Sequence, residues 1–302
     1  MSRFSKGLKV AWGTIIDYSF IVPTVLFIIA FMIYPVLYNI WLSMTDLNVM
    51  NFRIGGSWVG LANYKQLLSD DIFKAAFVNT LVFVFACIFF QFTIGFALAV
   101  LFNNRFPGSN IMRATLMISW MLPKVVAGTL FRWILSGDFG ILNQFLRGAG
   151  LISQNILWLS SSQLALWGII IANVWIGIPF NMIILLGGLQ TLSEELFEAA
   201  KIDGAGPWQV FVKITLPLLR PTIMILLILG FIYTSKVFDL VHVMTQGGPL
   251  NSTQLLPYYS YVQSFQFFNF GKGAAISGVI FVFLIVLSGL YLRETQKEDI
   301  MG

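Results

Sequence analysis

The fold is decided by an apolar stretch at Ala75–Phe102, which reads AAFVNTLVFVFACIFFQFTIGFALAVLF. The stretch contains no charged residue and exceeds the ~20 residues that an α-helix needs to cross a bilayer. Similar stretches follow along the chain, and Pro and Gly inside them are tolerated by membrane helices. The sequence predicts six transmembrane helices: Tyr18–Leu42, Ala75–Phe102, Ala114–Leu135, Gln163–Leu189, Thr222–Met244 and Ala274–Leu292.

The composition agrees with a membrane protein. Of the 302 residues, 58% are hydrophobic and 10% are charged, whereas soluble domains carry about 25% charged residues. The net charge of +5 comes from basic residues scattered at the ends of apolar runs, with no basic face or nucleic-acid motif. We therefore expect an all-α, polytopic protein of the lipid bilayer that does not bind nucleic acid.

The orientation follows from Lys and Arg in the loops, which are more frequent on the cytoplasmic side. With the N-terminus inside, the inner segments hold ten such residues and the outer segments five, so both termini are predicted to be cytoplasmic. The inner ones are Arg3, Lys6, Lys9, Arg105, Arg113, Lys201, Lys213, Arg220, Arg293 and Lys297, and the outer ones are Arg53, Lys65, Lys74, Arg147 and Lys272.

The longest inner loop, Gln190–Pro221, predicts two short helices. Thr191 or Ser193 can cap the first helix, whose first turn is acidic, as the helix dipole favours. Gly204 is typical of a helix C-terminus, and Pro207 of the start of a second helix. That second helix is expected to present Trp208, Phe211 and Val212 on one face and to end at Pro217.

The first of these helices is too acidic for a lipid surface. It contains Glu194, Glu195, Glu198 and Asp203 against the single Lys201. A helix that lies on a membrane normally carries Lys and Arg on its polar face. We therefore interpret the loop as a docking site for a protein.

The stretch Glu198–Pro221, EAAKIDGAGPWQVFVKITLPLLRP, resembles the EAA loop of binding-protein-dependent ABC importer permeases. Four further motifs resemble the carbohydrate-type members, in particular the first maltose or glycerol-3-phosphate permease subunit. They are Gly60–Tyr64 (GLANY), Asp138–Asn143 (DFGILN), Thr245–Pro249 (TQGGP) and Gly273–Ser277 (GAAIS). The resemblance covers essentially the whole chain.

The resemblance implies a type I ABC importer permease architecture in one transmembrane domain, residues 1–302. An N-terminal span and outer loop would occupy 1–74, and a five-span core would occupy 75–292, with the cytoplasmic loop at 190–221. The expected partners are a second, homologous permease subunit, two copies of an ATPase subunit and an extracytoplasmic substrate-binding protein, in a bacterial cytoplasmic (inner) membrane. The residues implied in ATPase docking are Glu198, Ala199, Ala200, Asp203, Gly204 and Ala205.

Substrate contacts are implied in the spans that flank this loop. The positions that hold sugar in the maltose permease correspond here to Ile176, Gly177, Phe180, Gly230, Tyr233, Thr234 and Val237, and Asn181 is an adjacent polar residue. Two positions that are asparagine in that relative are Thr234 and Val237 here, which argues against maltose itself.

Charged residues in the fifth span add further candidates. Lys236, Asp239 and His242 recur at steps of three, which would place them roughly on one helix face. Charges inside a span usually face a cavity or a partner, so Lys236 and Asp239 are interpreted either as a structural ion pair or as a cavity wall that contacts substrate. Lys124 in the third span has the same two interpretations.

The chain itself carries no expected catalytic chemistry. It lacks the GxxxxGK[ST] phosphate loop, so ATP and Mg would be bound by the partner ATPase subunits. With one His and one Cys, no metal site or Cys/His catalysis is expected. The acid pairs Asp70–Asp71 and Glu194–Glu195 are interpreted as solvated charges.

Three alternatives remain beside the sugar permease. An ion-coupled secondary transporter would show inverted repeats and broken half-helices, and an intramembrane enzyme would need a paired constellation for which only Lys236, Asp239 and His242 come near. A non-carbohydrate ABC permease is the third. The loop Gly247–Gly271, rich in Tyr and Phe, is interpreted either as an interfacial aromatic belt or as a surface that meets a soluble partner.

Overall fold

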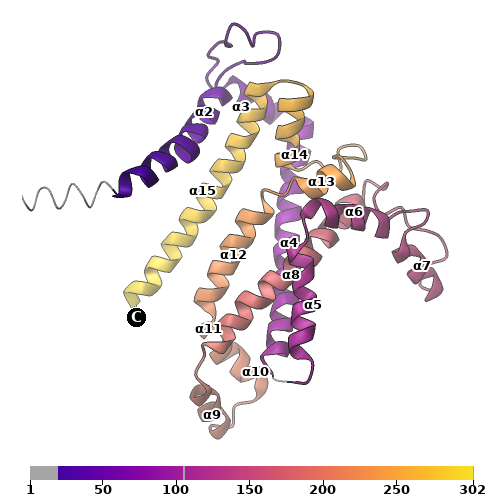
Figure 1. The fold of residues 1–302 in the computed structure, drawn as a ribbon, viewed down its shortest axis with the longest axis vertical. Coiled ribbons are helices and arrows are strands. Elements are labelled where there is room, and N and C mark those ends of the chain that lie inside the picture. The colour runs from indigo at the N-terminus through magenta and orange to yellow at the C-terminus, as the bar shows by residue number, and fades with distance from the viewer. Residues whose placement is uncertain (1–19, 105, 302) are drawn as a thin grey trace, which may run out of the picture.

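The computed structural model describes residues 20–104 and 106–301, which form a bundle of helices (Figure 1). Within the described residues the only extended pairing is an isolated bridge between Thr45 and Trp58. The helices are η1 (Ile29–Ile33), α2 (Tyr34–Ser43), α3 (Ala62–Ser69), α4 (Asp71–Asn103), α5 (Ser109–Met121), α6 (Lys124–Ile134), α7 (Ile141–Gly148), α8 (Ala165–Gln190), α9 (Glu194–Ile202), α10 (Pro207–Val210), η2 (Phe211–Thr215), α11 (Leu216–Leu218), α12 (Arg220–Thr234), α13 (Asp239–Met244), α14 (Leu256–Tyr261), η3 (Val262–Gln266) and α15 (Phe270–Met301).

Four of the six predicted spans correspond to continuous helices, and the other two are broken. Four helices are long and apolar enough to cross a membrane, namely Phe20–Ser43, Asp71–Asn103, Ala165–Gln190 and Phe270–Gly289, and they contain or closely match four predictions. Tyr18, the predicted start of the first span, and the basic residues Arg3, Lys6 and Lys9 lie outside the described residues.

The prediction of one helix at Ala114–Leu135 was wrong. The chain there forms α5 and α6, which meet at an angle of 99°. The break falls at Leu122–Pro123, where Leu122 is extended (ψ 137°). A residue before proline is pushed out of the helical region, which explains why the helix stops at this point.

The fifth predicted span, Thr222–Met244, is also broken. Helix α12 ends at Thr234, and α13 begins only at Asp239. Lys236 therefore lies in a turn between two helices, and the expected common helix face with Asp239 and His242 does not exist. The bend on the other side of α12, between Pro207–Leu218 and Arg220–Thr234, is 67°.

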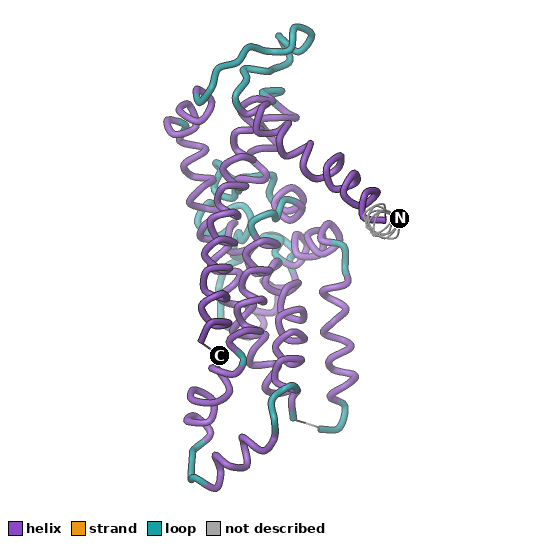
Figure 2. Tube along the Cα trace, turned by 90° about the vertical axis from the view of Figure 1, so that its left-hand side faces the viewer, coloured by secondary structure: helices purple, strands orange, loops and turns teal. Residues whose placement is uncertain are grey.

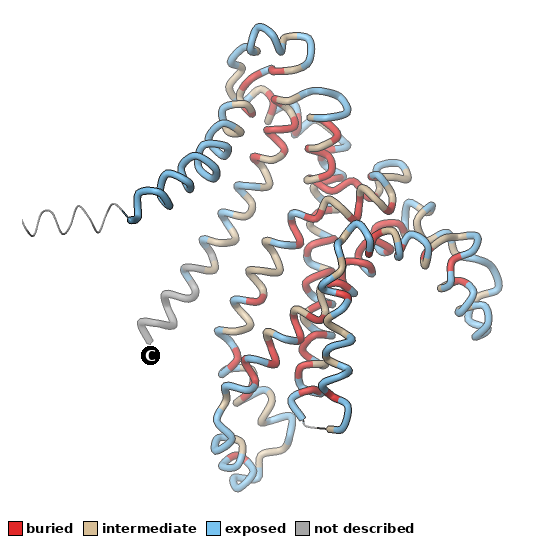
Figure 3. The backbone as a smooth tube through the Cα atoms, viewed as in Figure 1, coloured by how far each residue is buried: buried red, intermediate tan, exposed pale blue. Residues whose placement is uncertain are grey.

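Helices α4 and α8 form the centre of the bundle. The most apolar 18-residue stretch is 61% buried in α8 and 39% buried in α4, against 28% in Phe270–Gly289 and none in Phe20–Ser43. Figure 3 shows buried residues concentrated along these two central helices, whereas the N-terminal helix is exposed along most of its length. The exposed apolar helices are therefore the ones that lipid or another subunit must cover.

Small residues let α4 and α8 approach closely. A Cβ added at Gly95 would lie 2.6 Å from the Cβ of Asn181, and one added at Gly177 would collide with the side-chain amide of Gln91. In the same contact, Gln91 Nε2 donates a hydrogen bond of 2.9 Å to the Asn173 carbonyl oxygen. Close backbone approach and buried polar bonds of this kind hold membrane helices together.

The loop predicted at Gln190–Pro221 projects past one end of the long helices, and the loop that follows α2 lies at the opposite end (Figures 1 and 2). Two short helices are present as predicted, but Pro217 does not end the second one. The chain forms a π-helical turn over Phe211–Thr215 and continues to Leu218. Proline lacks an N–H and disrupts the regular α-helical bond pattern, and the π turn directly before Pro217 accommodates that defect.

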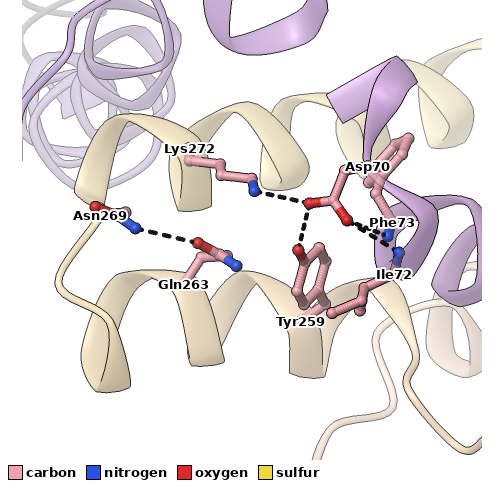
Figure 4. Close-up of polar contacts among 7 residues, drawn as sticks. All are labelled: Asp70, Ile72, Phe73, Tyr259, Gln263, Asn269 and Lys272. Atoms are coloured by element: carbon pink, nitrogen blue, oxygen red, sulfur yellow. Dashed lines mark hydrogen bonds and ion pairs between the residues drawn. The ribbon is translucent and has the colours of Figure 1, made fainter. Parts of the chain in front are cut away.

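The interpretation of Asp70 as a solvated charge was wrong (Figure 4). Its Oδ1 caps α4 by accepting from the backbone N–H groups of Ile72 and Phe73 at 2.9 and 3.2 Å. Its Oδ2 accepts from Lys272 Nζ at 2.7 Å and from the Tyr259 hydroxyl at 2.6 Å. Burial would raise the pKa of Asp70, but the hydrogen bonds from Lys272 and Tyr259 outweigh it and lower the pKa below its usual value of 3.8.

The aromatic segment Gly247–Gly271 is divided between core and surface. Tyr258 and Tyr259 on α14 are each 2% exposed and belong to the hydrophobic core, so they form no part of a belt. Phe265 and Phe267 near the end of the segment are 63% and 61% exposed. The exposed aromatic residues of the segment therefore lie in its latter part, whereas its first part exposes the aliphatic Leu250 (90%).

Candidate functional site

A cavity of about 300 Å³ lies between α4, α8, α12 and the junction of α5 with α6. Its volume is at the lower end of the roughly 300–1,000 Å³ typical of small-molecule pockets. The lining residues are Gln91, Trp120, Lys124, Asn173, Ile176, Gly177, Phe180, Asn181, Leu226, Gly230, Tyr233 and Thr234.

Three aromatic rings, one from each of three helices, contact one another in a row along the cavity wall. Trp120 of α5 stacks on Phe180 of α8, with ring centroids 5.7 Å apart and planes inclined by 18°. The edge-to-face contact between Phe180 and Tyr233 of α12 has a centroid distance of 6.5 Å. Tyr233 is 56% exposed, so its ring is available to a ligand.

Amide side chains add neutral polar groups to this wall. Gln91 Nε2 donates a hydrogen bond to the Asn173 carbonyl oxygen, and Asn181 Nδ2 donates one to the Gly177 carbonyl oxygen at 2.9 Å. These bonds fix the orientation of both side chains. A cavity with aromatic faces and a few fixed polar groups can bind a ligand that is partly apolar and partly hydroxylated.

The charged residues near the cavity are Lys124, Lys236 and Asp239. Lys124 lines the cavity as the first residue of α6. Lys236 Nζ lies 5.7 Å from the centroid of the Tyr233 ring. Asp239 begins α13, which packs against α6, but within residues 20–104 and 106–301 no ion pair of 4 Å or less joins any two of the three. The structural Lys236–Asp239 pair considered from the sequence is therefore not formed.

The sequence candidates separate into two groups. Seven line the cavity: Ile176, Gly177, Phe180, Asn181, Gly230, Tyr233 and Thr234. Val237 does not, because it is 1% exposed within the core that surrounds α13. Lys236 and Asp239 lie near the cavity without lining it, and His242 stacks on Phe238 at 5.3 Å beside α14.

Four lining residues were missed: Gln91, Trp120, Asn173 and Leu226. Polar residues inside apolar spans are costly and often mark a pathway, so Gln91 and Asn173 carried a usable signal in the sequence. Trp120 and Leu226 carried none, because an apolar residue in a membrane span is ordinary.

The hairpin of α9 and α10 is built by local hydrogen bonds. Ser193 Oγ caps α9 by accepting from the Glu195 N–H at 3.3 Å. At the other end the Gly204 N–H donates to the Lys201 carbonyl at 3.1 Å, and the Ala205 N–H donates to the Ala200 carbonyl at 2.9 Å. This pair of bonds is a Schellman motif, which requires the left-handed backbone that Gly204 adopts with φ +75°.

The hairpin presents most of its surface outward. Of the residues expected to dock a partner, Glu198, Ala199, Asp203 and Gly204 are exposed, Ala205 is half-buried and Ala200 is buried. Ile202 and Trp208 are 87% and 73% exposed. Trp208 and Phe211 share a face as expected, with stacked rings 5.7 Å apart, and Phe211 also packs edge-on against Phe96 of α4 at 5.4 Å.

Comparison with known proteins identifies relatives of the whole chain. Residues 91–296 match the family described as the binding-protein-dependent transport system inner membrane component. The lactose transport system permease protein of Rhizobium radiobacter is 34% identical, with 99% of this chain and 100% of the relative covered. The trehalose/maltose transport system permease protein of Thermococcus litoralis is 32% identical, with 92% of each chain covered.

A similar fold occurs in a solved structure. One chain of the crystal structure of a bacterial alginate ABC transporter, in complex with an alginate pentasaccharide-bound periplasmic protein, superposes with a TM-score of 0.81. The sequence identity is 21%, and the alignment covers 98% of each chain.

Proposed function

Because the chain belongs to the family of binding-protein-dependent transport system inner membrane components, we propose that it is the permease subunit of an ATP-binding-cassette importer that moves a sugar, an oligosaccharide or a polyol derivative into the cytoplasm. The observation that carries this proposal is the cavity with its three aromatic rings and fixed amides. The names of the lactose and trehalose/maltose relatives point to the same class of solute.

The energy for transport comes from other polypeptides. Two ATPase subunits bind ATP and Mg, and the exposed hairpin around Glu198 and Gly204 is the docking surface for one of them. The acidic first turn of α9 supports a protein partner over a lipid surface, and the exposed Ile202 and Trp208 offer that partner apolar contacts. With this hairpin inside the cell, both termini are cytoplasmic in a bacterial inner membrane.

The transporter is completed by a second, homologous permease subunit and an extracytoplasmic binding protein. The largely exposed helix Phe20–Ser43 supports a subunit contact in the membrane, because its most apolar 18-residue stretch is 0% buried, against 28–61% in the other three continuous helices. We assign residues 1–302 to one permease domain, in which the segment 1–74 precedes a five-span core at 75–292. The cavity opens alternately to either side as the ATPases close and separate.

The test is uptake into proteoliposomes that contain this chain with its partner permease and ATPases, together with the cognate binding protein. Labelled trehalose, maltose, lactose, glycerol 3-phosphate and galacturonate would be offered as probes. We expect uptake of at least one probe that requires internal ATP and persists with an uncoupler. Uptake without ATP that collapses with an uncoupler would identify an ion-coupled transporter instead.

A further inference from the structure

We propose that the cavity binds a saccharide that carries an acidic group, a carboxylate, sulfonate or phosphate, and that Lys124 is the residue that binds this group. The inference rests on the sugar-permease function proposed above and specifies the substrate class of the same site.

The first observation is an unpaired lysine in the cavity wall. Lys124 is half-buried and lines the cavity at the bend between α5 and α6. No hydrogen bond or ion pair to its ammonium group occurs within the described part of the chain. A charge inside a membrane span is costly and is retained where it serves a pathway or a ligand.

The second observation is the sign of the surrounding charge. None of the lining residues is Asp or Glu. Lys236 adds a second positive charge beside Tyr233, and Asp239 adds a negative charge at the start of α13, which packs against α6. Two lysines against one aspartate leave a net positive charge at this edge of the cavity.

The backbone contributes in the same direction. Lys124 is the first residue of α6, and the N-terminus of a helix carries a partial positive charge that favours anions. The N-terminal end of α6 therefore adds to the positive potential that attracts an anion to this part of the cavity.

The rest of the cavity suits the neutral part of the same molecule. The Trp120, Phe180 and Tyr233 rings offer faces for a sugar ring, and the amides of Gln91 and Asn181 offer groups for hydroxyls. An acidic saccharide therefore uses the aromatic wall and the lysine at once, whereas a neutral sugar leaves the ammonium group without a partner.

The first experiment uses pairs of saccharides that differ in charge. The cognate binding protein is screened by thermal shift with galacturonate against galactose, glucose 6-phosphate against glucose, and sulfoquinovose against glucose, and each ligand is then tested for ATP-dependent uptake. We expect at least one acidic member to bind and to be imported while its neutral parent is not. Import of neutral saccharides alone overturns this inference and leaves the proposed function intact, whereas failure of every saccharide overturns both.

The second experiment tests Lys124 in the complete importer. At saturating, loaded binding protein, Lys124→Met is expected to reduce uptake of the acidic saccharide at least about tenfold, since a hydrogen bond to a charged group contributes about 1.5–3 kcal/mol. Lys124→Arg should retain most of the uptake, and Lys65→Met, which removes an exposed lysine of α3, should not change it. Wild-type uptake by Lys124→Met overturns the assignment.

Unfolding temperatures of the purified complexes show whether each variant is folded. If Lys124→Met unfolds, competition on the wild type decides instead. Excess unlabelled acidic saccharide should block uptake of the labelled one, and inhibition by its neutral parent at the same concentration would overturn the inference.

Discussion

Lys272 Nζ lies 2.7 Å from Asp70 Oδ2, although 202 residues separate the two in the sequence. Their side chains are 24% and 15% exposed, so the pair is largely shielded from water. The same carboxylate accepts from Tyr259 and caps α4, and it therefore joins the starts of α4 and α15 to α14 (Figure 4). This contact closes the bundle at the end opposite the α9–α10 hairpin.

Substitution of Asp70 is expected to destabilise the protein. Asp70→Ala removes a helix cap worth ~1 kcal/mol and leaves Lys272 and Tyr259 without their acceptor, at a further cost of about 1–3 kcal/mol. The matched control is Asp71→Ala, because Asp71 is 93% exposed and its ion pair among the described residues is with the exposed Lys74, a contact worth about 0–1 kcal/mol. Tryptophan fluorescence of the purified complex on heating measures both, and equal unfolding temperatures would contradict the role given to Asp70.

The contribution of Asp70 should also depend on pH. Because the pKa of Asp70 is lowered in the folded protein, its ionised form stabilises the fold above the unfolded pKa of about 4 and stops doing so as the pH falls through the folded pKa. Wild type should therefore be more stable than Asp70→Asn at pH 7, and this difference should shrink below about pH 4. Unfolding temperatures measured from pH 7 to pH 3 check this, and a difference that grows on acidification would refute it.

Gly177 is expected to be intolerant of even a methyl group. In Gly177→Ala the new Cβ would meet the Gln91 amide, disturb its bond to Asn173 and change the cavity wall. Overpacking of this kind typically costs about 1–3 kcal/mol. Gly187→Ala on the same helix is the control, since nothing lies within 4 Å of its added Cβ. Saccharide uptake and the unfolding temperature should fall for Gly177→Ala only.

Two changes in the hairpin should separate the ATPase from the membrane subunit. Gly204→Asp places a non-glycine residue in a left-handed backbone conformation, at a cost of roughly 1–2 kcal/mol, and adds a charge to the docking surface. Glu198→Arg reverses a charge on the same surface. Copurification of the ATPase with this chain and coupled transport should both be lost. The control is Lys65→Glu, a charge reversal at an exposed residue of α3 outside the hairpin. Normal copurification and transport in both test variants would refute the docking role.

The sequence predicted where the chain crosses the membrane but not where it bends. Apolar content alone marks Ala114–Leu135 and Thr222–Met244 as spans. It does not reveal that the helical hydrogen-bond pattern is interrupted around Leu122 and Lys236. Pro123 was the one local signal for the first break. The pairing of Asp70 with Lys272 was invisible, because it depends on the packing of segments far apart in the sequence.

The candidate site was predicted in part for the same reason. Positions carried over by resemblance on α8 and α12 line the cavity because those helices are regular up to Thr234. The transfer fails at Val237, where the turn after α12 rotates the side chain into the core. Gln91 and Trp120 lie on α4 and α5, which the resemblance did not address, and Asn173 lies on α8 outside the positions that were carried over.

The bend at Leu219 couples the orientation of α12 to that of the hairpin, because the two segments are joined directly at this residue. Leu219 is 1% exposed and belongs to one core cluster with Leu226 and Met182, at the 67° bend between the hairpin and α12. Helix α12 has 15 residues and is about 22 Å long. A rotation of this helix by about 10° about Leu219 would displace its far end by about 4 Å. Tyr233 and Thr234 are located at that far end, where such a displacement would change the width of the cavity.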